Sequence, residues 1–298
     1  MAIPRIDQAL VDRGLAGSLE EARLMVLEGK VYLGAGKVSK PSDKVKQGLA
    51  LTVRQPGMRY VSRGALKLEK ALKAFGVEVG GRVCLDVGAS TGGFTQVLLE
   101  AGASKVYAVD VGFGLLDWRL RQDPRVAVME KTNARSLTPD LFSPAPSLGV
   151  TDVSFISLRA VLPRAFAVLA GENRRFVALV KPQFEAPKEQ VSPGGVVRDR
   201  QVHLDTLAYV AGEVEKLGWV CQGVDFSPIT GAQGNIEFLM DLKPGDTAGP
   251  AMTGTDFRRA VEAAWRAHPQ NPGQPQDRPG EWPKAPGTAL SRNQAGTG

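Results

Sequence analysis

A glycine-rich segment in the first third of the chain has the residue types and spacing of a ligand-binding turn. An apolar run at 83–85 leads into Asp86, and glycines follow at positions 88, 92 and 93. This order predicts a strand, a tight turn and a helix N-terminus, because glycine lets a backbone turn sharply and a ligand approach closely. The free N–H groups of a helix N-terminus can also bind a carboxylate. We therefore expect a cofactor to bind at this turn.

The spacing of the glycines indicates which cofactor. It is Gly-x-x-x-Gly-Gly after an aspartate, whereas dinucleotide pyrophosphates are bound by Gly-x-Gly-x-x-Gly. Asp110 ends the next expected strand, at the place where doubly wound folds put a carboxylate for ribose hydroxyls. We therefore favour S-adenosylmethionine over a nicotinamide cofactor. The residues expected to contact it are Asp86, Gly88, Ala89, Ser90, Gly92, Gly93, Phe94, Asp110, Val111, Asn133 and Asp152.

Four charged residues outside this turn form a second candidate group: Lys67, Asp152, Lys181 and Glu237. Each of them alone is also explained as a solvated surface charge or a helix cap. Together they suggest proton chemistry, since a ribose 2′-hydroxyl must lose its proton as it attacks a methyl sulfonium. A lysine amine can accept that proton or stabilise the alkoxide. The group therefore suggests methyl transfer to a hydroxyl.

The elements that must position these residues alternate regularly between strands and helices. Strands are expected at 83–85, 105–110, 126–130, 148–155, 176–182, 219–224 and 236–240, with helices such as 158–169 and 203–217 between most of them. This alternation predicts an α/β fold with a Rossmann-like doubly wound sheet. Because ligands bind beyond the carboxyl ends of such strands, five polar residues should converge on one rim. They are Asp86, Asp110, Asn133, Asp152 and Lys181.

Residues 1–56 are expected to form a separate, small α+β domain of two short helices and a hairpin. Residues 1–73 hold 14 lysines and arginines against 7 aspartates and glutamates, a net charge of +7 that exceeds the +6 of the whole chain. A basic segment ahead of a nearly neutral one indicates contact with a polyanion. A well-solvated surface without a nucleic acid partner is the alternative.

The remaining boundaries follow from composition. Residues 57–61 are interpreted as a linker and residues 62–243 as the catalytic domain. From 244 to 298 the chain is rich in Gly, Pro, Gln, Thr and Ala. One helix is expected at 256–268, and the rest of this tail is expected to be largely disordered.

Several classes of protein are disfavoured by composition. No window reaches the roughly 18 consecutive apolar residues of a membrane span, and the N-terminus lacks the features of a signal peptide, so a cytoplasmic protein is expected. Cys84 and Cys221 lie in apolar runs, which predicts buried thiols and no disulfide partner. The two histidines have no Cys or His neighbours, so no metal is expected.

The motifs resemble those of a known family. Residues 62–68, 86–94, 152–158, 180–185 and 194–197 are similar to the TlyA family, often labelled hemolysin A, and the resemblance spans about 4–243. Its members are ribosomal RNA 2′-O-methyltransferases with an FtsJ-like methyltransferase domain behind an RNA-binding domain of the ribosomal small-subunit protein type. Where this family often has tryptophan in its linker, the chain has Tyr60.

The resemblance implies roles for individual residues. Lys67, Asp152, Lys181 and Glu237 match the FtsJ-like Lys-Asp-Lys-Glu tetrad, with Lys181 nearest to the 2′-hydroxyl. Cytidine ribose in ribosomal RNA is then the first candidate substrate, and ribosomal RNA or ribosomal subunits are the expected partners. The residues expected to contact RNA are Arg5, Arg13, Arg23, Lys30, Lys40 and Arg63.

Neighbouring reactions fit the residues less well. Methylation of cytosine C5 needs a cysteine nucleophile, usually after proline, whereas Cys84 and Cys221 both follow valine within strand-like runs. Methylation of exocyclic amines generally uses an Asn/Asp-Pro-Pro-aromatic loop, and the chain reads Asp-Val-Ser-Phe from position 152. Two other classes stay open: a non-catalytic RNA-binding or ribosome-assembly factor, and a cytolysin, for which no inserting segment or export signal is seen.

Overall fold

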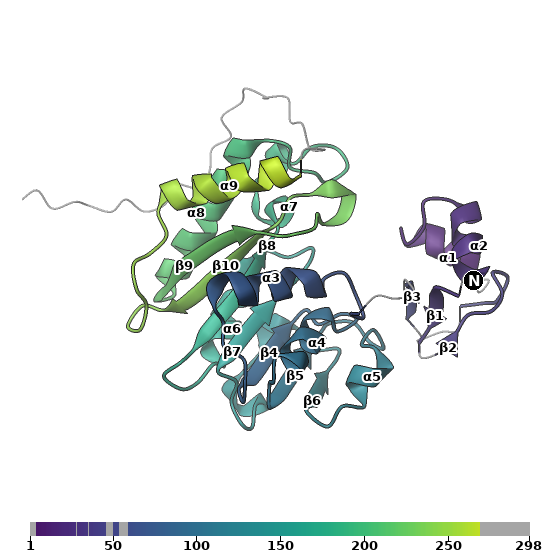
Figure 1. Ribbon diagram of the computed structural model, residues 1–298, viewed down its shortest axis with the longest axis horizontal. Helices are drawn as coiled ribbons and strands as arrows, with labels where there is room; N and C mark the ends of the chain where they lie inside the picture. The colour runs from purple at the N-terminus through teal and green to yellow at the C-terminus, as the bar shows by residue number, and fades with distance from the viewer. Residues whose placement is uncertain (1–3, 28, 35, 46–49, 54–58, 269–298) are drawn as a thin grey trace, which may run out of the picture.

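The computed structural model describes residues 4–27, 29–34, 36–45, 50–53 and 59–268. These residues form a small N-terminal domain and a larger α/β domain (Figure 1).

The N-terminal domain consists of two helices and a small antiparallel sheet. Helices α1 (Ile6–Asp12) and α2 (Leu19–Leu27) accompany strands β1 (Val31–Leu33), β2 (Gly36–Lys37) and β3 (Leu51–Val53), which lie in the order β2-β1-β3. Its core is made of apolar side chains spaced one helical turn apart, such as Ile6 and Leu10 of α1 and Ala22 and Val26 of α2. The expected α+β domain is therefore present.

The larger domain is built on a seven-stranded sheet in the order β6-β5-β4-β7-β8-β10-β9. Its strands are β4 (Val83–Val87), β5 (Lys105–Val109), β6 (Val126–Met129), β7 (Leu148–Thr151), β8 (Arg175–Val180), β9 (Trp219–Phe226) and β10 (Phe238–Pro244). Strands β4 to β8 run parallel, and β10 is antiparallel to β8 and β9. Since β5 and β6 lie on one side of β4 and β7 and β8 on the other, the topological switch point falls between β4 and β7. The Rossmann-like fold is confirmed.

Helices cover both faces of this sheet (Figure 1). One face is covered by α3 (Ala65–Phe75), α4 (Gly93–Glu100) and α5 (Trp118–Arg121), and the other by α6 (Leu158–Ala167), α8 (Arg200–Lys216) and α9 (Gly254–Ala267). The connections hold α7 (Pro182–Glu185) and the 3-10 turns η1 (Ala134–Ser136), η2 (Pro139–Leu141), η3 (Lys188–Gln190) and η4 (Ala232–Gly234). Two apolar cores thus enclose strands that are themselves largely apolar.

The folded domain continues past residue 243, where composition places the start of the tail. Helix α9 begins with a capping box between Thr253 and Asp256, and it buries Phe257 and Val261 in the core shared with α6 and α8. The indole Nε1 of Trp265 also donates to a histidine of α8. Helix α9 therefore packs on the larger domain, because apolar residues four apart give it a face to bury. The rest of the expected tail lies outside the described residues.

The cysteines are buried as expected. Cys84 lies in β4 and Cys221 in β9, both as free thiols, and burial raises the pKa of each to about 12. Among the described residues, no cluster of His, Cys, Asp and Glu side chains is arranged to hold a metal ion. No helix in the described part of the chain is both long and apolar enough to cross a bilayer.

Candidate active site

A cavity of about 360 Å³ lies at the carboxyl edge of the sheet, at the switch point. Six of the expected cofactor contacts line it: Gly88, Ser90, Asp110, Val111, Asn133 and Asp152. The lining also includes residues that the sequence did not single out individually: Leu115, Thr132, Val153, Ser154, Phe155 and Ile156. Most of these follow the same strand ends as the expected residues, so their place after a strand is the signal that could have found them.

Asp110 connects two loops around this cavity. Its Oδ2 accepts a hydrogen bond from the backbone N–H of Ser90 at 2.7 Å, and its Oδ1 accepts one from that of Gly112 at 2.7 Å. Each carboxylate oxygen has a second lone pair and can accept a further bond. Asp110 can therefore hold the glycine turn and the loop after β5 together while it binds a hydroxyl in the cavity.

Gly88 explains why the turn needs glycine beside the cavity. Its φ of +85° is in the left-handed region, and a Cβ there would lie 3.1 Å from the carbonyl oxygen of Asp152 and from a methyl carbon of Val153. Side chains other than glycine rarely adopt this conformation. The turn and the start of the loop after β7 can therefore approach each other only because residue 88 has no side chain.

Five expected cofactor contacts lie outside the cavity lining: Asp86, Ala89, Gly92, Gly93 and Phe94. Asp86 is fully buried, and its Oδ2 accepts a hydrogen bond from Thr95 Oγ1 at 2.7 Å. A Cβ on Gly92 would overlap two leucine side chains, one within α5 and one just before it. A Cβ on Gly93 would overlap the hydroxyl of Ser62, which precedes α3. Contact with a cofactor stays a prediction for these five residues. In the structure, the two glycines permit close packing of helices, and Asp86 and Phe94 are packed inside the domain.

The burial of Asp86 predicts a pH-dependent stability. Desolvation raises its pKa from 3.8 to about 7, so the folded state holds this proton more tightly than the unfolded state. The stabilising contribution of the protonated carboxyl is present below pH 4 and is lost as pH rises to about 7. Asp86→Asn keeps an acceptor for Thr95 and should remove this loss. We expect the stability of the variant relative to the wild type to rise by a few kcal/mol between pH 4 and 7, at about 1.4 kcal/mol per pKa unit.

Urea unfolding of both proteins at several pH values measures this difference in the free energy of unfolding. Other titrating groups are present in both proteins, so the difference reports on Asp86. Parallel stability curves for the two proteins would show that the Asp86 carboxyl titrates normally.

The four charged residues expected to act together are brought together at this rim. Lys181 Nζ lies 2.6 Å from Asp152 Oδ1 and donates to Ser154 Oγ at 2.7 Å. Lys67 Nζ lies 3.6 Å from Asp152 Oδ2 and 2.6 Å from Glu237 Oε2. Amines and carboxylates thus alternate in the order Glu237, Lys67, Asp152, Lys181, and solvent screens such buried pairs only weakly. Burial raises the pKa of Glu237, while the two lysines oppose this rise.

Each member of this group comes from an element that ends at the same rim. Lys67 projects from the first turn of α3, Asp152 follows β7 and Lys181 follows β8. Glu237 precedes β10, which runs antiparallel to β8, so the start of β10 meets the carboxyl ends of the parallel strands. The loop before it is fixed by a hydrogen bond from the Ser227 N–H to the Glu237 carbonyl at 2.8 Å.

Gly231 leaves space for the Glu237 carboxylate. Its φ of −73° is open to any residue, but a Cβ there would overlap Glu237 Oε1. Gly231→Ala should therefore push this carboxylate away from Lys67 and lower the turnover number by about 10-fold to 100-fold, the scale of a 1 Å misplacement. Steady-state kinetics measures the effect. Gly212→Ala is the matched control, since a Cβ on this α8 glycine meets no atom within 4 Å; equal rates for both variants would contradict the role given to Gly231.

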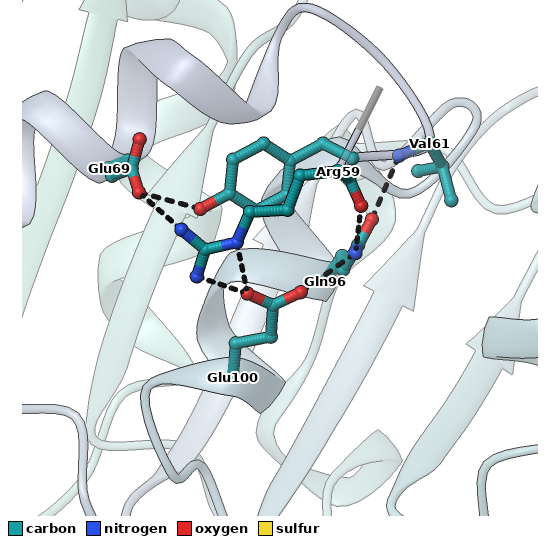
Figure 2. Close-up of polar contacts among 6 residues, drawn as sticks. Arg59, Val61, Glu69, Gln96 and Glu100 are labelled. Atoms are coloured by element: carbon teal, nitrogen blue, oxygen red, sulfur yellow. Dashed lines mark hydrogen bonds and ion pairs between the residues drawn. The ribbon is translucent and has the colours of Figure 1, made fainter. Parts of the chain in front are cut away.

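The end of the expected linker is anchored on α3, which carries Lys67, and on α4 (Figure 2). Arg59 pairs with Glu69 of α3 at 3.2 Å and with Glu100 of α4 at 2.7 Å, and the Tyr60 hydroxyl donates to Glu69 at 2.7 Å. Gln96 of α4 donates to the carbonyl of Arg59 at 3.1 Å. Tyr60 is buried, where the family often has tryptophan. The chain therefore enters α3, and with it Lys67, from a fixed position on α4.

The cations expected to contact RNA lie at the surface: Arg5, Arg13, Arg23, Lys40 and Arg63 are exposed and Lys30 is half-buried. Arg5 and Arg23 both pair with buried Asp7, at 2.8 and 3.2 Å, and the hydrogen bond from Arg5 lowers the pKa of Asp7 to about 2. These two guanidinium groups are therefore held in place on the domain surface.

A Rossmann-like domain with this cavity and this lysine–carboxylate cluster belongs to the class of methyltransferases. Comparison with known families agrees, since residues 60–243 match the FtsJ-like methyltransferase family and residues 4–51 match the S4 domain. The chain belongs to the FtsJ-like methyltransferase family, in the TlyA type that has an S4 domain ahead of the catalytic domain.

Individual relatives cover most of the chain. It is 50% identical over 240 residues to the 16S/23S rRNA (cytidine-2′-O)-methyltransferase TlyA of Mycobacterium tuberculosis, which spans 80% of this chain and 89% of that protein. It is 41% identical to hemolysin A of Brachyspira hyodysenteriae, over 79% of this chain and 98% of that protein. The solved structure of a protein of Streptococcus thermophilus, assigned as a hemolysin, superimposes with a TM-score of 0.74 at 42% identity, over 91% of this chain and 98% of that one. The resemblance to the TlyA family is confirmed.

Proposed function

We propose that this methyltransferase uses S-adenosylmethionine to methylate the 2′-hydroxyl of a ribose in ribosomal RNA, with cytidine as the first candidate nucleoside. One observation carries the proposal. Asp152 and Ser154 line the cavity, and both contact the amine of Lys181. The proton-handling group therefore lies at the wall of the cavity that would hold the methyl donor.

The residues of the cavity fit S-adenosylmethionine. Gly88 has no side chain where a ligand would approach the turn, and Asp110 can accept hydrogen bonds from ribose hydroxyls. Val111, Leu115 and Ile156 supply apolar surface for a nucleobase. When bound, S-adenosylmethionine supplies an electrophilic methyl group on a sulfonium sulfur.

The tetrad then handles the proton of the attacking hydroxyl. Lys181 Nζ would hold this proton, or accept it as a neutral amine, as the oxygen–carbon bond forms and the carbon–sulfur bond of the sulfonium breaks to leave a thioether. Asp152 orients Lys181 through Oδ1 and holds Lys67 through Oδ2. Glu237 balances the positive charge of Lys67. Asp152 therefore does not have to balance two lysines by itself. This arrangement suits an oxygen acceptor, which needs a proton removed but no covalent enzyme intermediate.

The N-terminal domain supplies affinity for the RNA. Its exposed cations can neutralise backbone phosphates, which gives binding that is strong but largely independent of sequence. Arg63 lies at the start of the catalytic domain, four residues before Lys67, and would contact the strand near the target. Such a substrate would be met in the cytoplasm, as free RNA or as a ribosomal subunit.

Mapping of 2′-O-methyl groups tests this function directly. Ribosomal RNA and isolated subunits are incubated with the protein and methyl-labelled S-adenosylmethionine, and modified positions are read by nucleoside analysis and primer extension. We expect at least one new 2′-O-methylcytidine and binding of S-adenosylmethionine in calorimetry. Methylation confined to bases would overturn the choice of acceptor. Binding of RNA without binding of S-adenosylmethionine would identify a non-catalytic RNA-binding factor.

A further inference from the structure

Two short segments leave the carboxyl ends of neighbouring strands β7 and β8 and run alongside each other. They are residues 152–158 and residues 181–185, here called the paired segments. At their start, Lys181 contacts Asp152 at 2.6 Å and Ser154 at 2.7 Å, which are the contacts described for the tetrad. Everything that moves residues 152–154 relative to Lys181 therefore changes the environment of the proposed catalytic amine.

The paired segments make two more contacts further from the strands. The rings of Phe184 and Phe155 lie with their centroids 5.1 Å apart. Beyond them, Glu185 accepts hydrogen bonds from Ser157 Oγ at 2.6 Å and from the Leu158 N–H at 2.7 Å. The contacts follow the same order along both segments, so Lys181 secures one end of the pair and Glu185 secures the other.

The backbone between these two ends is strained. Phe155 has a φ of +63°, a backbone conformation that residues with a side chain rarely adopt. It is also 90% exposed. A strained residue with little burial keeps its conformation only when its surroundings hold it. Lys181 and Glu185 supply hydrogen bonds to residues on the two sides of Phe155, so both can contribute to holding the loop.

Glu185 is half-buried, and its carboxylate lies at the start of α6. Burial raises its pKa to about 7, against the lowering effects of its hydrogen bonds with Ser157 and Leu158 and of the Arg159 charge. Burying a carboxylate is unfavourable unless its hydrogen bonds are well made. It accepts two hydrogen bonds, one from the cap residue of α6 and one from the first residue of that helix.

We propose that Glu185 is a positioning residue for methyl transfer, which holds residues 152–155 so that Asp152 and Ser154 face Lys181. It acts through Ser157 and Leu158 and does not itself touch the reacting atoms. This role rests on the proposed function of Lys181.

Three substitutions separate reach from charge at this position. Glu185→Asp keeps the charge but is one methylene shorter, so it cannot make both hydrogen bonds. Glu185→Gln keeps the reach, with an amide oxygen for the Leu158 N–H and an amide N–H for Ser157 Oγ, whereas Glu185→Ala loses both contacts. At saturating S-adenosylmethionine and RNA, we expect single-turnover rates 10-fold to 100-fold lower for the aspartate and alanine variants and within about threefold of wild type for the glutamine variant.

Two further variants complete the experiment. Ser157→Ala removes the partner hydroxyl, and its effect should not add to that of Glu185→Ala, because the alanine at position 185 has already lost the contact with this hydroxyl. Glu189→Asp makes the same chemical change at an exposed position and should leave the rate unchanged. The apparent KM for RNA should change less than the turnover number, since the cations of the N-terminal domain bind the RNA.

The outcomes are distinct. The proposal is supported if glutamine restores the rate that aspartate loses and thermal unfolding shows every variant folded at the assay temperature. It is overturned if Glu185→Asp is as fast as wild type, if the glutamine variant is as slow as the aspartate variant, or if the loss matches the unfolded fraction. A Lys181→Ala variant with full activity would instead refute the proposed function. An inactive Lys181→Ala beside a fully active Glu185→Asp would refute the positioning role alone.

Discussion

Lys181→Ala is expected to lower the single-turnover rate of methyl transfer by roughly 10²-fold to 10⁴-fold, the usual contribution of a positioned acid–base group. The alanine cannot hold the hydroxyl proton next to the cavity. Binding of S-adenosylmethionine should persist, because Gly88, Asp110 and Val111 line the cavity from other strand ends. Asp152 also keeps its contact with Lys67. Rapid-quench assays with methyl-labelled donor measure the rate, and calorimetry measures the binding.

Lys216→Ala is a matched control for this change, because Lys216 is an exposed residue near the end of α8 that pairs with Glu213 of its own helix. Its rate should equal that of the wild type. A Lys181→Ala protein that methylates RNA at the wild-type rate would remove Lys181 from the mechanism. Loss of donor binding together with activity would instead indicate that Lys181 supports the cavity.

Arg13→Ala combined with Lys40→Ala is expected to weaken RNA binding strongly and to make it less sensitive to salt. Both residues are exposed on the N-terminal domain. Each phosphate contact releases counterions, so losing two contacts should reduce the slope of log K against log salt by roughly 1.5 to 2. Filter binding from low to moderate salt measures this slope. The turnover number at saturating RNA should remain close to that of the wild type.

Arg5 and Arg23 provide the contrast to this pair. Because both bind buried Asp7, replacing them leaves a buried carboxylate with fewer partners and should lower stability as well as RNA affinity. An unchanged salt slope in the Arg13/Lys40 double variant, with weaker binding at every salt concentration, would show that these two residues stabilise the domain and do not contact phosphates.

The convergence of the site could be predicted from sequence in part. Asp110, Asn133 and Asp152 follow parallel strands, and the rule that such ends meet at one rim placed them correctly around the cavity. Glu237 precedes its strand, and only the antiparallel direction of β10 brings it to that rim. Strand direction is decided by long-range pairing, so the local pattern contains no sign of it. The sequence could therefore list Glu237 among the candidate charged residues, but it could not show that Glu237 meets the carboxyl ends of the parallel strands.

The glycines of the turn show a second limit. Gly88, Gly92 and Gly93 look alike in the sequence, yet only Gly88 lines the cavity, while the other two make room for neighbouring helices. Spacing can identify a turn, but it cannot say whether the missing Cβ leaves space for a ligand or for a side chain. The neighbours that decide this come from α3 and α5, which lie elsewhere in the chain.

Helix α9 illustrates how composition can hide a folded element. The segment after 243 is rich in residues typical of disordered tails, but Phe257, Val261 and Trp265 recur every four residues. This spacing gives one apolar face, which packs against the domain. Periodicity was therefore a better guide here than average composition.

The two buried cysteines have a practical consequence for studying this enzyme in solution. A thiol reacts as its thiolate, and Cys84 and Cys221 are both buried, with pKa values raised to about 12. In the folded protein they should resist maleimide reagents. A cysteine introduced at an exposed site in each domain would then take the fluorophores without removal of the native pair, so that energy transfer could follow the distance between the domains as RNA binds.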